Sequence, residues 1–407
     1  MKVQVMADAE QWESLVPTEL DHTPSILVLF HCESNPGFAA SSHEHTFLRA
    51  ALNLAGNYSK VHFAYRDLSR GMTPSLPQEL VNIIQIDNSW NTPGRLLPIQ
   101  RYIEQNRISI VFGFDQPVRR PLYRYLRKGG VTTFVSYWGA PMSSLNKGFK
   151  LLLKRVDARL SPWGPDHYIF QSEGMRKTAV HGRGIPIAKT SIVRTGIDTD
   201  VFFRNPNQRF YCHESFNIPK DRKIVFFSGH MEPRKGVGVL VRTAMHLIDQ
   251  GYQKAHFVIL GNRHGQEQPY LELLGEHPAR NHVTFGGYRS DIPSLLSGCS
   301  LGLIASTGWD SFPMSSLEMS AAELPLLVSD LPGLRETVHD GAGVTFEPGN
   351  IDECARKIRQ LLDDPDTAAV IGKKGRERVL KGYSRVQQVE AIESIIRTHA
   401  RLKRPET

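Results

Sequence analysis

Two adjacent cations follow an apolar, strand-like run in the second half of the chain. Phe226 and Phe227 end that run, and the loop 228–236 then carries Arg234 and Lys235 just before a helical pattern that begins at Val237. Two cations beside the start of a helix can bind an anion, because the first helical amides also point outward. Taken alone, this loop is better explained as a basic surface turn. Its interpretation depends on the residues that follow.

A second candidate cluster begins where another apolar run ends, at residue 309. Ser311 can cap the helix expected there, and Pro313 suits its first turn. The backbone amides near Met314 and Ser315 would then lack partners within the helix. Unpaired amides at the start of a helix suit a pyrophosphate group.

Two carboxylates flank this helix start. Glu318 falls one to two turns into the helix, where a carboxylate can accept hydrogen bonds from both hydroxyls of a ribose. Asp310 precedes the helix and would lie nearer to a sugar. Asp198 and Asp200 form an Asp-x-Asp pattern typical of metal-dependent transferases, but they lie in a linker, so we expect no metal site there.

The elements that must position these residues follow a repeated strand–helix rhythm, which predicts βαβ units and parallel sheets. The expected strands are 25–30, 61–65, 108–114 and 132–135 in the first half, and 223–227, 256–260, 301–304 and 326–329 in the second. The first strand of each half runs into a glycine-bearing loop, 31–37 with Gly37 and 228–236 with Gly229. Ligands bind at the carboxyl ends of such strands, so we expect both loops to line one cleft.

Length and composition agree with two globular domains. A chain of 407 residues is too long to fold around one ordinary hydrophobic core. Its longest apolar runs are far shorter than a membrane-spanning helix. The first ten residues show no signal peptide, and the four widely spaced cysteines form no metal or redox pattern. We therefore expect a cytoplasmic protein with free thiols.

The positive charge is concentrated in one region. Residues 95–187 hold 16 Lys and Arg against 5 Asp and Glu, whereas the whole chain has a net charge of +8. Within this region, segment 145–160 has apolar residues at helical spacing with basic residues between them, which predicts a basic amphipathic helix. Such a helix can rest on an anionic membrane, or it can turn its apolar side to the core and leave its basic side in solvent.

The second half of the chain resembles the retaining glycosyltransferases of family 4. The family signature is an acidic residue, seven residues and then Glu, which Asp310 and Glu318 supply at that spacing. Segment 229–236 before it, segments 324–330 and 341–349 after it, and the linker 194–202 also match the family in order. The resemblance is strong over roughly residues 165–385 and weak before them.

The resemblance implies an α/β fold of the GT-B type, with two facing Rossmann-like, doubly wound domains and a cleft between them. The N-terminal acceptor domain would span 1–205, and the donor domain would span 206–385. A C-terminal helix within 386–407 would cross back to the first domain.

The resemblance also implies roles for residues of the donor domain. Lys235 and Arg234 would pair with the donor phosphates, Glu318 would hold the ribose, and Asp310 with the following loop would hold the sugar. The full set of residues expected at the donor is Gly37, Gly229, His230, Tyr288, Arg289, Ser311, Phe312, Pro313, Met314, Ser315 and Glu318, with Lys235, Arg234 and Asp310 as catalytic residues. Three departures from the family stand out: Asp310 replaces the usual Glu, His230 replaces the usual Arg, and segment 135–139 lacks the usual histidine.

The implied reaction moves a hexose from a nucleotide sugar, with UDP-glucose favoured over GDP-mannose, to a glycan or lipid-linked acceptor of an envelope or extracellular polysaccharide. Cations and helix amides would stabilise the leaving diphosphate without a metal or other cofactor. The implied reaction retains the anomeric configuration through attack on the face that the phosphate leaves, so no protein nucleophile is required. A leaving-phosphate oxygen could take the acceptor's proton, which would explain the lack of an obvious catalytic base. The alternatives are a nucleotide-sugar epimerase or a phosphorylase of the same fold. A nucleic-acid-binding module would explain the basic region but not Asp310 and Glu318, so we expect no nucleic-acid partner.

Overall fold

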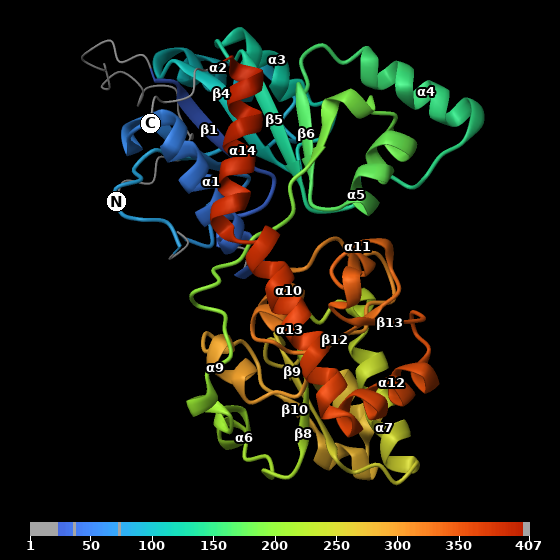
Figure 1. The fold of residues 1–407 in the computed structure, drawn as a ribbon. Coiled ribbons are helices and arrows are strands. Elements are labelled where there is room, and N and C mark those ends of the chain that lie inside the picture. Colours follow the sequence, from blue (N-terminus) through green and yellow to red (C-terminus); the bar gives the residue numbers. More distant parts are fainter. Residues whose placement is uncertain (1–22, 36–37, 72–74, 402–407) are drawn as a thin grey trace. The chain divides into compact units, whose positions relative to one another are not determined.

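The structure of the protein is a computed structural model that describes residues 23–35, 38–71 and 75–401. The chain divides into two compact units. Unit 1 contains the chain up to Arg194 together with the segment from Val386 onward, and unit 2 is Thr195–Arg385. Each unit is built around one parallel β-sheet, shown as arrows in Figure 1.

The sheet of unit 1 has seven strands in the order β3-β2-β1-β4-β5-β6-β7. The strands are β1 (Ser25–Phe30), β2 (Val61–Tyr65), β3 (Ile83–Gln85), β4 (Ile108–Phe114), β5 (Thr133–Trp138), β6 (His167–Phe170) and β7 (Thr190–Ile192). All neighbours pair in parallel, and the order reverses at β1 and β4, as in a Rossmann-like sheet. The carboxyl ends of β1 and β4 therefore lie side by side where a ligand site is expected.

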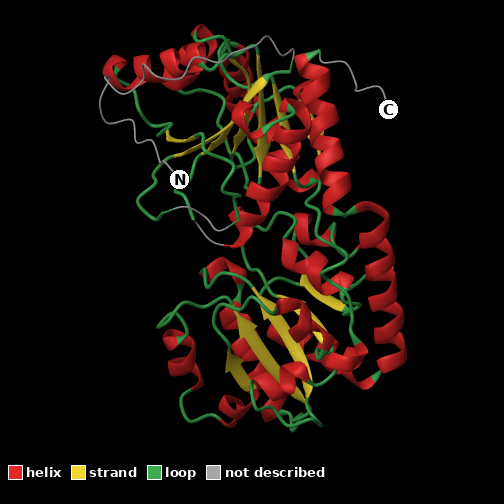
Figure 2. Ribbon diagram, turned by 90° about the vertical axis from the view of Figure 1, so that its left-hand side faces the viewer, coloured by secondary structure: helices red, strands yellow, loops and turns green. Residues whose placement is uncertain are grey.

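Helices cover both faces of this sheet, which explains why its strands are almost continuously apolar. Figure 2 shows strands flanked by helices. One core packs α1 and α14 against alternate strand residues, and the other packs α2 and α3 against the remaining ones. The helices are α1 (Phe38–Ala55), α2 (Pro93–Gln105), α3 (Pro121–Lys128), α4 (Gly148–Arg159), α5 (Glu173–Lys177) and α14 (Arg385–Ala400).

The C-terminal helix α14 packs on unit 1, as the sequence predicted for a crossover helix. Val389, Ile392 and Ile396 are buried in the same core as β1, β2 and α1. Gln388 donates a hydrogen bond from Nε2 to the hydroxyl of Tyr137 at 2.9 Å. The regularly spaced apolar residues of this helix thus pack against the core of unit 1.

The sheet of unit 2 has six parallel strands in the order β10-β9-β8-β11-β12-β13. The strands are β8 (Lys223–Ser228), β9 (Ala255–Leu260), β10 (Val283–Phe285), β11 (Leu301–Ile304), β12 (Leu326–Ser329) and β13 (Val344–Phe346). The helices are α6 (Tyr211–Ser215), α7 (Val237–Asp249), α8 (Gln268–Leu274), α9 (Ile292–Ser297), α10 (Met314–Ala321), α11 (Pro332–Arg335), α12 (Ile351–Asp363) and α13 (Pro365–Gly382). One core contains α7, α8 and α12, and the other contains α6, α9, α10, α11 and α13.

The segment that follows Arg194 packs with unit 2. Ile197 forms a bridge with Ser384, and Phe202 is buried in the core that contains α10. The guanidinium of Arg204 donates to the carbonyl of Cys299 at 3.0 Å. The structure therefore divides the chain at 194, whereas the sequence analysis placed the domain boundary after 205.

No helix within the described ranges has both the length and the apolar character needed to cross a membrane.

Candidate active site

The loop between β8 and α7 is pressed against the loop that follows β11. Its last residue, Gly236, has φ of 76°, and a Cβ there would lie 1.7 Å from the carbonyl oxygen of Ala305. No other residue fits that position. The amide of Thr307 donates to the carbonyl of Arg234 at 2.8 Å, which joins the two loops directly. Glycine is therefore required at position 236 because the backbone of this loop lies so close to the backbone at Ala305.

This close approach brings Lys235 onto Asp310. The ammonium group lies 2.9 Å from both carboxylate oxygens, and Ser306 donates to one of them at 2.8 Å. The amide of Ser311 donates to the other at 3.0 Å. Asp310 is only 4% exposed and the Lys235 side chain 15%. The structure thus joins two residues expected at the donor into one buried ion pair, with both Asp310 oxygens engaged.

Arg234 lies against Trp309 beside this pair. Its guanidinium stacks 3.8 Å from the centroid of the indole ring and donates to the Trp309 carbonyl at 3.1 Å. Glu232 forms an ion pair with its Nε at 2.7 Å. Stacking and hydrogen bonding hold the guanidinium plane in one orientation, as an anion-binding arginine requires.

His230 contributes little positive charge to this loop. Partial desolvation lowers its pKa, Glu232 opposes that shift, and Lys235 and Arg234 add to the lowering, although the side chain keeps an exposed surface. The hydroxyl of Tyr288 lies 3.5 Å from its Nδ1. Because a histidine with a lowered pKa is neutral at pH 7, Arg234 and Lys235 carry the cationic charge here.

Helix α10 begins later than the sequence suggested. Pro313 occupies the N-cap position without a side-chain cap, so the prediction that Ser311 caps this helix is wrong. Ser311 is buried because the α11 region packs tightly on it: a Cβ at Gly333 would lie 1.9 Å from its carbonyl oxygen. The first-turn amides, including those of Met314 and Ser315, have no partner within the helix by geometry.

Phe312 belongs to the core of unit 2. It is 1% exposed, and its ring lies 5.3 Å from that of Tyr383. It therefore anchors the loop before α10 from beneath, and only its backbone is suited to contact a ligand.

Glu318 lies on the same side of α10 as Met314, one turn further on. It is buried, and burial raises its pKa to about 7, while the positive charge of Arg385 opposes that rise. A carboxylate that is costly to ionise in the free protein gains stability when hydroxyl groups donate to it. This property suits a ribose-binding carboxylate.

Other residues expected at the donor take varied places. The amide of Gly229 already donates to the carbonyl of Leu260 at 3.1 Å, so Gly229 offers space instead of a hydrogen bond. Arg289 is held by Asp291, with Nε at 2.8 Å, and it stacks on Phe216. Tyr288 is half exposed. Gly37 lies outside the described residues.

Sequence reasoning missed two supports of this site. Ser306 is fully buried and donates to Asp310, and its position two residues after β11, four residues before Asp310, was the available signal. The positive charge of Arg385 favours the ionised form of Glu318. Arg385 lies at the start of α14, and nothing in its local sequence indicated this effect.

The Asp-x-Asp pattern forms a turn. Asp198 accepts hydrogen bonds at Oδ1 from the amides of Asp200, at 3.1 Å, and Val201, at 3.3 Å. Within the described ranges, no group of three or more His, Cys, Asp or Glu side chains is placed to hold a metal ion. That the reaction needs no metal stays a prediction.

Comparison with known proteins identifies the segment that builds this site. Residues 210–378 match the family described as "Glycosyl transferases group 1". This match lies within unit 2 and covers less than half of the chain. The family resemblance predicted from Asp310 and Glu318 is confirmed.

Curated relatives that match parts of the chain are named for different sugars. The chain is 33% identical over 150 residues to an alpha-D-kanosaminyltransferase of Streptomyces kanamyceticus, covering 36% of this chain and 38% of that protein. It is 29% identical over 235 residues to a GDP-mannose-dependent alpha-(1-6)-phosphatidylinositol monomannoside mannosyltransferase of Mycobacterium tuberculosis, covering 53% and 57%. The chain thus spans less than two thirds of the length of either relative.

Solved structures extend the likeness to nearly the whole chain. A glycosyltransferase from Rickettsia africae superposes with a TM-score of 0.75 at 18% identity, covering 93% of this chain and all of that one. The Anabaena protein HepE in complex with UDP superposes with a TM-score of 0.71 at 18% identity, covering 92% and 100%. At this identity the likeness concerns the fold, and it confirms the GT-B type predicted from the sequence.

Proposed function

We propose that this chain is a glycosyltransferase that moves a hexose from a nucleoside diphosphate sugar to a glycan or lipid-linked acceptor, with retention of configuration. The observation that carries the proposal is the buried Lys235–Asp310 ion pair beside the start of α10, with Glu318 one turn into that helix. Lys235, Arg234 and the first-turn amides would stabilise the diphosphate as the anomeric bond breaks. Glu318 would accept hydrogen bonds from the ribose.

Asp310 has two roles in this proposal. Its bidentate contact sets the position of Lys235 in the free protein. When a donor binds, the phosphates would share the lysine with Asp310, and the loop 311–314 would place the sugar beside it. The family position of Asp310 and its contact with Lys235 both support this arrangement.

UDP-glucose is the favoured donor, and GDP-mannose is the alternative. HepE, a structural neighbour, was solved with UDP, and the mycobacterial relative is named for GDP-mannose. The acceptor fits envelope or extracellular polysaccharide synthesis, since another relative is a capsular polysaccharide glycosyltransferase of Staphylococcus aureus. An epimerase would change the sugar of the donor without transferring it to a glycan, and a phosphorylase would use inorganic phosphate instead of a nucleotide.

A ligand panel tests the donor site directly. Thermal denaturation with UDP, GDP, ADP and their sugars should show the largest rise with UDP and UDP-glucose, since a ligand at about 100 times its Kd adds about 2.7 kcal/mol. Lys235→Ala should abolish the rise, whereas Lys374→Ala on α13, outside the site, should keep it. If no nucleotide stabilises the protein, or if RNA or DNA does so instead, the proposed function is wrong.

Helix α4 supports a further part of the proposal, contact with an anionic membrane surface. None of its residues is buried, and its apolar side chains point to solvent, with Phe149 73% exposed. The alternative in which its apolar side faces the core is therefore wrong. The exposed apolar residues of the segment are Leu145, Phe149, Leu152, Leu153, Val156 and Leu160.

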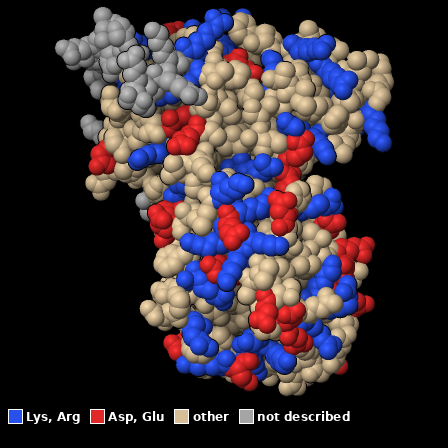
Figure 3. Space-filling view, in the orientation of Figure 1, with Lys and Arg blue, Asp and Glu red and all other residues tan. Residues whose placement is uncertain are grey.

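Polar contacts fasten α4 to unit 1 instead. Asp157 forms ion pairs with Arg119, at 3.0 Å, and with Arg183. Over the region that α4 occupies in Figure 1, Figure 3 shows Lys and Arg side chains among uncharged atoms. Exposed apolar groups interleaved with Lys147, Lys150 and Lys154 match an anionic leaflet, where each basic residue adds about 1 kcal/mol of attraction. This leaflet would be the cytoplasmic one.

Vesicle co-sedimentation tests the membrane contact. The protein should bind vesicles that contain phosphatidylserine but not neutral ones, and salt should weaken the binding. Changing Lys147, Lys150 and Lys154 to Glu should abolish it, whereas the same change at three exposed lysines of α13 (Lys373, Lys374 and Lys381) should not. Equal sedimentation of both triple variants would contradict a membrane role for α4.

A further inference from the structure

Unit 2 has a cavity at the edge of its sheet opposite to the Lys235–Asp310 pair. Its volume is about 340 Å³, and two of its lining residues, Lys223 and Ser300, stand at the start of β8 and directly before β11. Helices α6 and α9, which lie side by side in Figure 1, supply further lining residues. Because β8 spans six residues, the two edges of the sheet are about 20 Å apart. The cavity is therefore separate from the candidate donor site.

The lining of this cavity is basic. Among the described residues that line it are five Lys and Arg side chains and no Asp or Glu. The five are Arg204, Arg209, Lys220, Arg222 and Lys223. Within the described ranges only Lys220 forms an ion pair, with Glu214 at 2.9 Å, and both of these side chains are more than half exposed. Like charges without counter-charges repel one another, so a bound anion would remove an unfavourable interaction from the free protein.

An aromatic ring and a backbone carbonyl orient several of these cations without neutralising them. Cζ of Arg209 and Nζ of Lys220 lie 4.6 and 4.7 Å from the centroid of the Phe210 ring. The guanidinium of Arg204 donates to the carbonyl of Cys299 at 3.0 Å. Neither a ring nor a carbonyl carries a full negative charge, so these contacts hold the side chains and leave their charge available.

Arg222 is held by three residues of unit 2. Its Nη1 donates to the carbonyl of Asn281 and to Nδ1 of His256, the latter at 3.1 Å. Burial and the charge of Arg222 lower the pKa of His256 to about 3, so this imidazole is neutral and can accept from the guanidinium. The carbonyl of Arg222 accepts a hydrogen bond at 3.0 Å from Nε2 of His213, which is buried. The backbone and the guanidinium of Arg222 are thus both positioned before any ligand binds.

Another cavity of unit 2 has a different charge pattern. It is lined by residues of α7 and α12 and has a volume of about 970 Å³. Arg356 and Arg359 line it together with three carboxylates, which are Asp352, Glu353 and Asp363. Charges of both signs compensate one another there, whereas the cavity at the start of β8 carries charge of one sign. A one-sign lining indicates an anionic ligand.

The lining suits a phosphate group on a small molecule. A planar guanidinium can donate two parallel hydrogen bonds to a phosphate. A phosphate monoester carries roughly 1.5 to 2 negative charges at pH 7, and therefore offsets more of the lining charge than one carboxylate does. Binding sites for small molecules have volumes of about 300 to 1,000 Å³, so this cavity has room for a small ligand but not for a polymer chain.

We propose that this cavity binds a small, soluble phosphate monoester, such as a sugar phosphate, at a site separate from that of the nucleotide sugar. The phosphate would lie against the arginine side chains of the lining. The inference goes beyond the proposed function and does not depend on it, because it uses only residues near the amino edge of the unit 2 sheet.

Isothermal titration calorimetry of the full chain with inorganic phosphate and ribose 5-phosphate tests the site, with ribose as the uncharged probe. Both phosphates should bind, and ribose should not. Arg209→Gln should weaken their binding at least about tenfold, since it removes one charged contact. Arg209 is exposed and its side chain makes no hydrogen bond with a described residue, so this variant should fold.

Arg359→Gln is the matched control. Arg359 is also an exposed arginine beside an aromatic ring, with its Cζ 5.3 Å from the centroid of the Tyr252 ring, but it lines the cavity of mixed charge. Its substitution should change phosphate binding by less than about twofold.

Phosphatidic acid presents the same phosphate monoester on a lipid. Its vesicles are therefore tested with the variant in which Lys147, Lys150 and Lys154 are changed to Glu, which removes the membrane contact proposed for α4. This variant should not sediment with them. Sedimentation that the further change Arg209→Gln abolishes would mean that the cavity binds a lipid headgroup, and would overturn a soluble ligand.

The two sites of unit 2 should respond independently. Lys235→Ala should bind ribose 5-phosphate as the wild type does, and Arg209→Gln should keep the stabilisation by UDP. Loss of ribose 5-phosphate binding in Lys235→Ala would place this phosphate at the nucleotide site and overturn the inference. Failure of the wild type to bind either phosphate, or equal binding by the wild type and Arg209→Gln, would overturn it as well. Binding of ribose 5-phosphate without binding of any nucleotide would contradict the proposed function alone.

Discussion

The two sheets each place a carboxylate beside a basic side chain at their carboxyl edges, but the two pairs are built differently. In unit 2, Lys235 contacts both oxygens of Asp310 at 2.9 Å, and Ser306 and the Ser311 amide complete the carboxylate's hydrogen bonds. In unit 1, His31 lies 4.0 Å from Asp115 with its facing nitrogen unbonded among the described residues.

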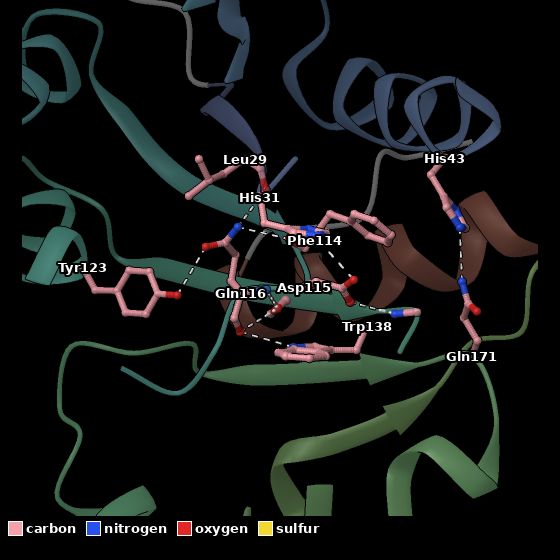
Figure 4. Close-up of polar contacts among 11 residues, drawn as sticks. Leu29, His31, His43, Phe114, Asp115, Gln116, Tyr123, Trp138 and Gln171 are labelled. Atoms are coloured by element: carbon pink, nitrogen blue, oxygen red, sulfur yellow. Dashed lines mark hydrogen bonds and ion pairs between the residues drawn. The ribbon is translucent and has the colours of Figure 1, made fainter. Parts of the chain in front are cut away.

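The two pairs therefore hold their basic side chains to different degrees. A closed ion pair holds a permanent cation in place, as stabilisation of a departing diphosphate requires. A separation of 4.0 Å is too long for a hydrogen bond, so in this open pair (Figure 4) the imidazole of His31 is held less tightly by its carboxylate. We therefore expect that substitutions in the Lys235–Asp310 pair of unit 2 stop every reaction of the donor. Substitutions in the His31–Asp115 pair of unit 1 should leave donor binding intact.

The largest effect should come from Lys235→Ala. Loss of a preorganised charge contact should lower diphosphate release at least about a hundredfold, with water or with a glycan as acceptor. Glu318→Ala should lower it by a similar factor through the ribose. Steady-state assays at saturating donor measure this, and near-normal turnover of either variant would show that its side chain has no role.

Removing one carboxylate from each pair should then separate the pairs by stability. Asp310→Asn leaves Lys235 largely buried without its counter-charge, and we expect a loss of about 3 kcal/mol in the free energy of unfolding. Asp115→Asn can still accept the Gly139 amide, so the expected loss stays below about 1 kcal/mol. Urea denaturation measures both, and equal losses would mean that the two pairs are energetically alike.

Much of unit 2 could be predicted from the sequence because its constraints are local. Strands β11 and β12 and the start of α7 lie where the apolar runs placed them. Gly236 has a local signature, since the loop must approach Ala305 closely. The contact between Lys235 and Asp310 was not predicted, because it depends on how the loops after β8 and β11 pack together.

The His31–Asp115 pair of unit 1 was harder to predict for the same reason. Strands β1, β2 and β4 were predicted with correct bounds, but β5 extends to Trp138, beyond the expected 132–135. His31 and Asp115 are far apart in sequence, and only the β1–β4 register brings them together. The short strands β3, β6, β7, β10 and β13 were missed because each is only three or four residues long and includes a polar residue, so it carries little periodicity.

Glu318 allows a smaller effect to be measured, because it is a carboxylate of unit 2 that is buried outside the Lys235–Asp310 ion pair. Its pKa of about 7 exceeds the 4.5 of an unperturbed Glu, so between these values the folded protein holds a proton that the unfolded chain has lost. The free energy of unfolding should therefore fall as pH rises from about 4.5 to 7, by roughly 3 kcal/mol at most.

Glu318→Gln should remove this penalty. The variant should be more stable than the wild type at pH 8 and about equal to it at pH 4.5, as measured by urea denaturation. Glu276→Gln, at an exposed position of unit 2, should show no such pH dependence. A Glu318→Gln difference that is the same at both pH values would mean that this carboxylate ionises normally.

The smallest effect should come from a chelator. If Lys235, Arg234 and the α10 amides supply the charge that stabilises the diphosphate, excess EDTA should change release by less than about twofold. The Asp198 carboxylate already accepts two backbone amides in its turn, which leaves it poorly suited to bind a cation. Complete loss of activity with EDTA, restored by Mg²⁺ or Mn²⁺, would mean that a metal ion provides this charge. The closed pair of unit 2 would then be a structural support, and its difference from the open pair of unit 1 would have no consequence for the diphosphate.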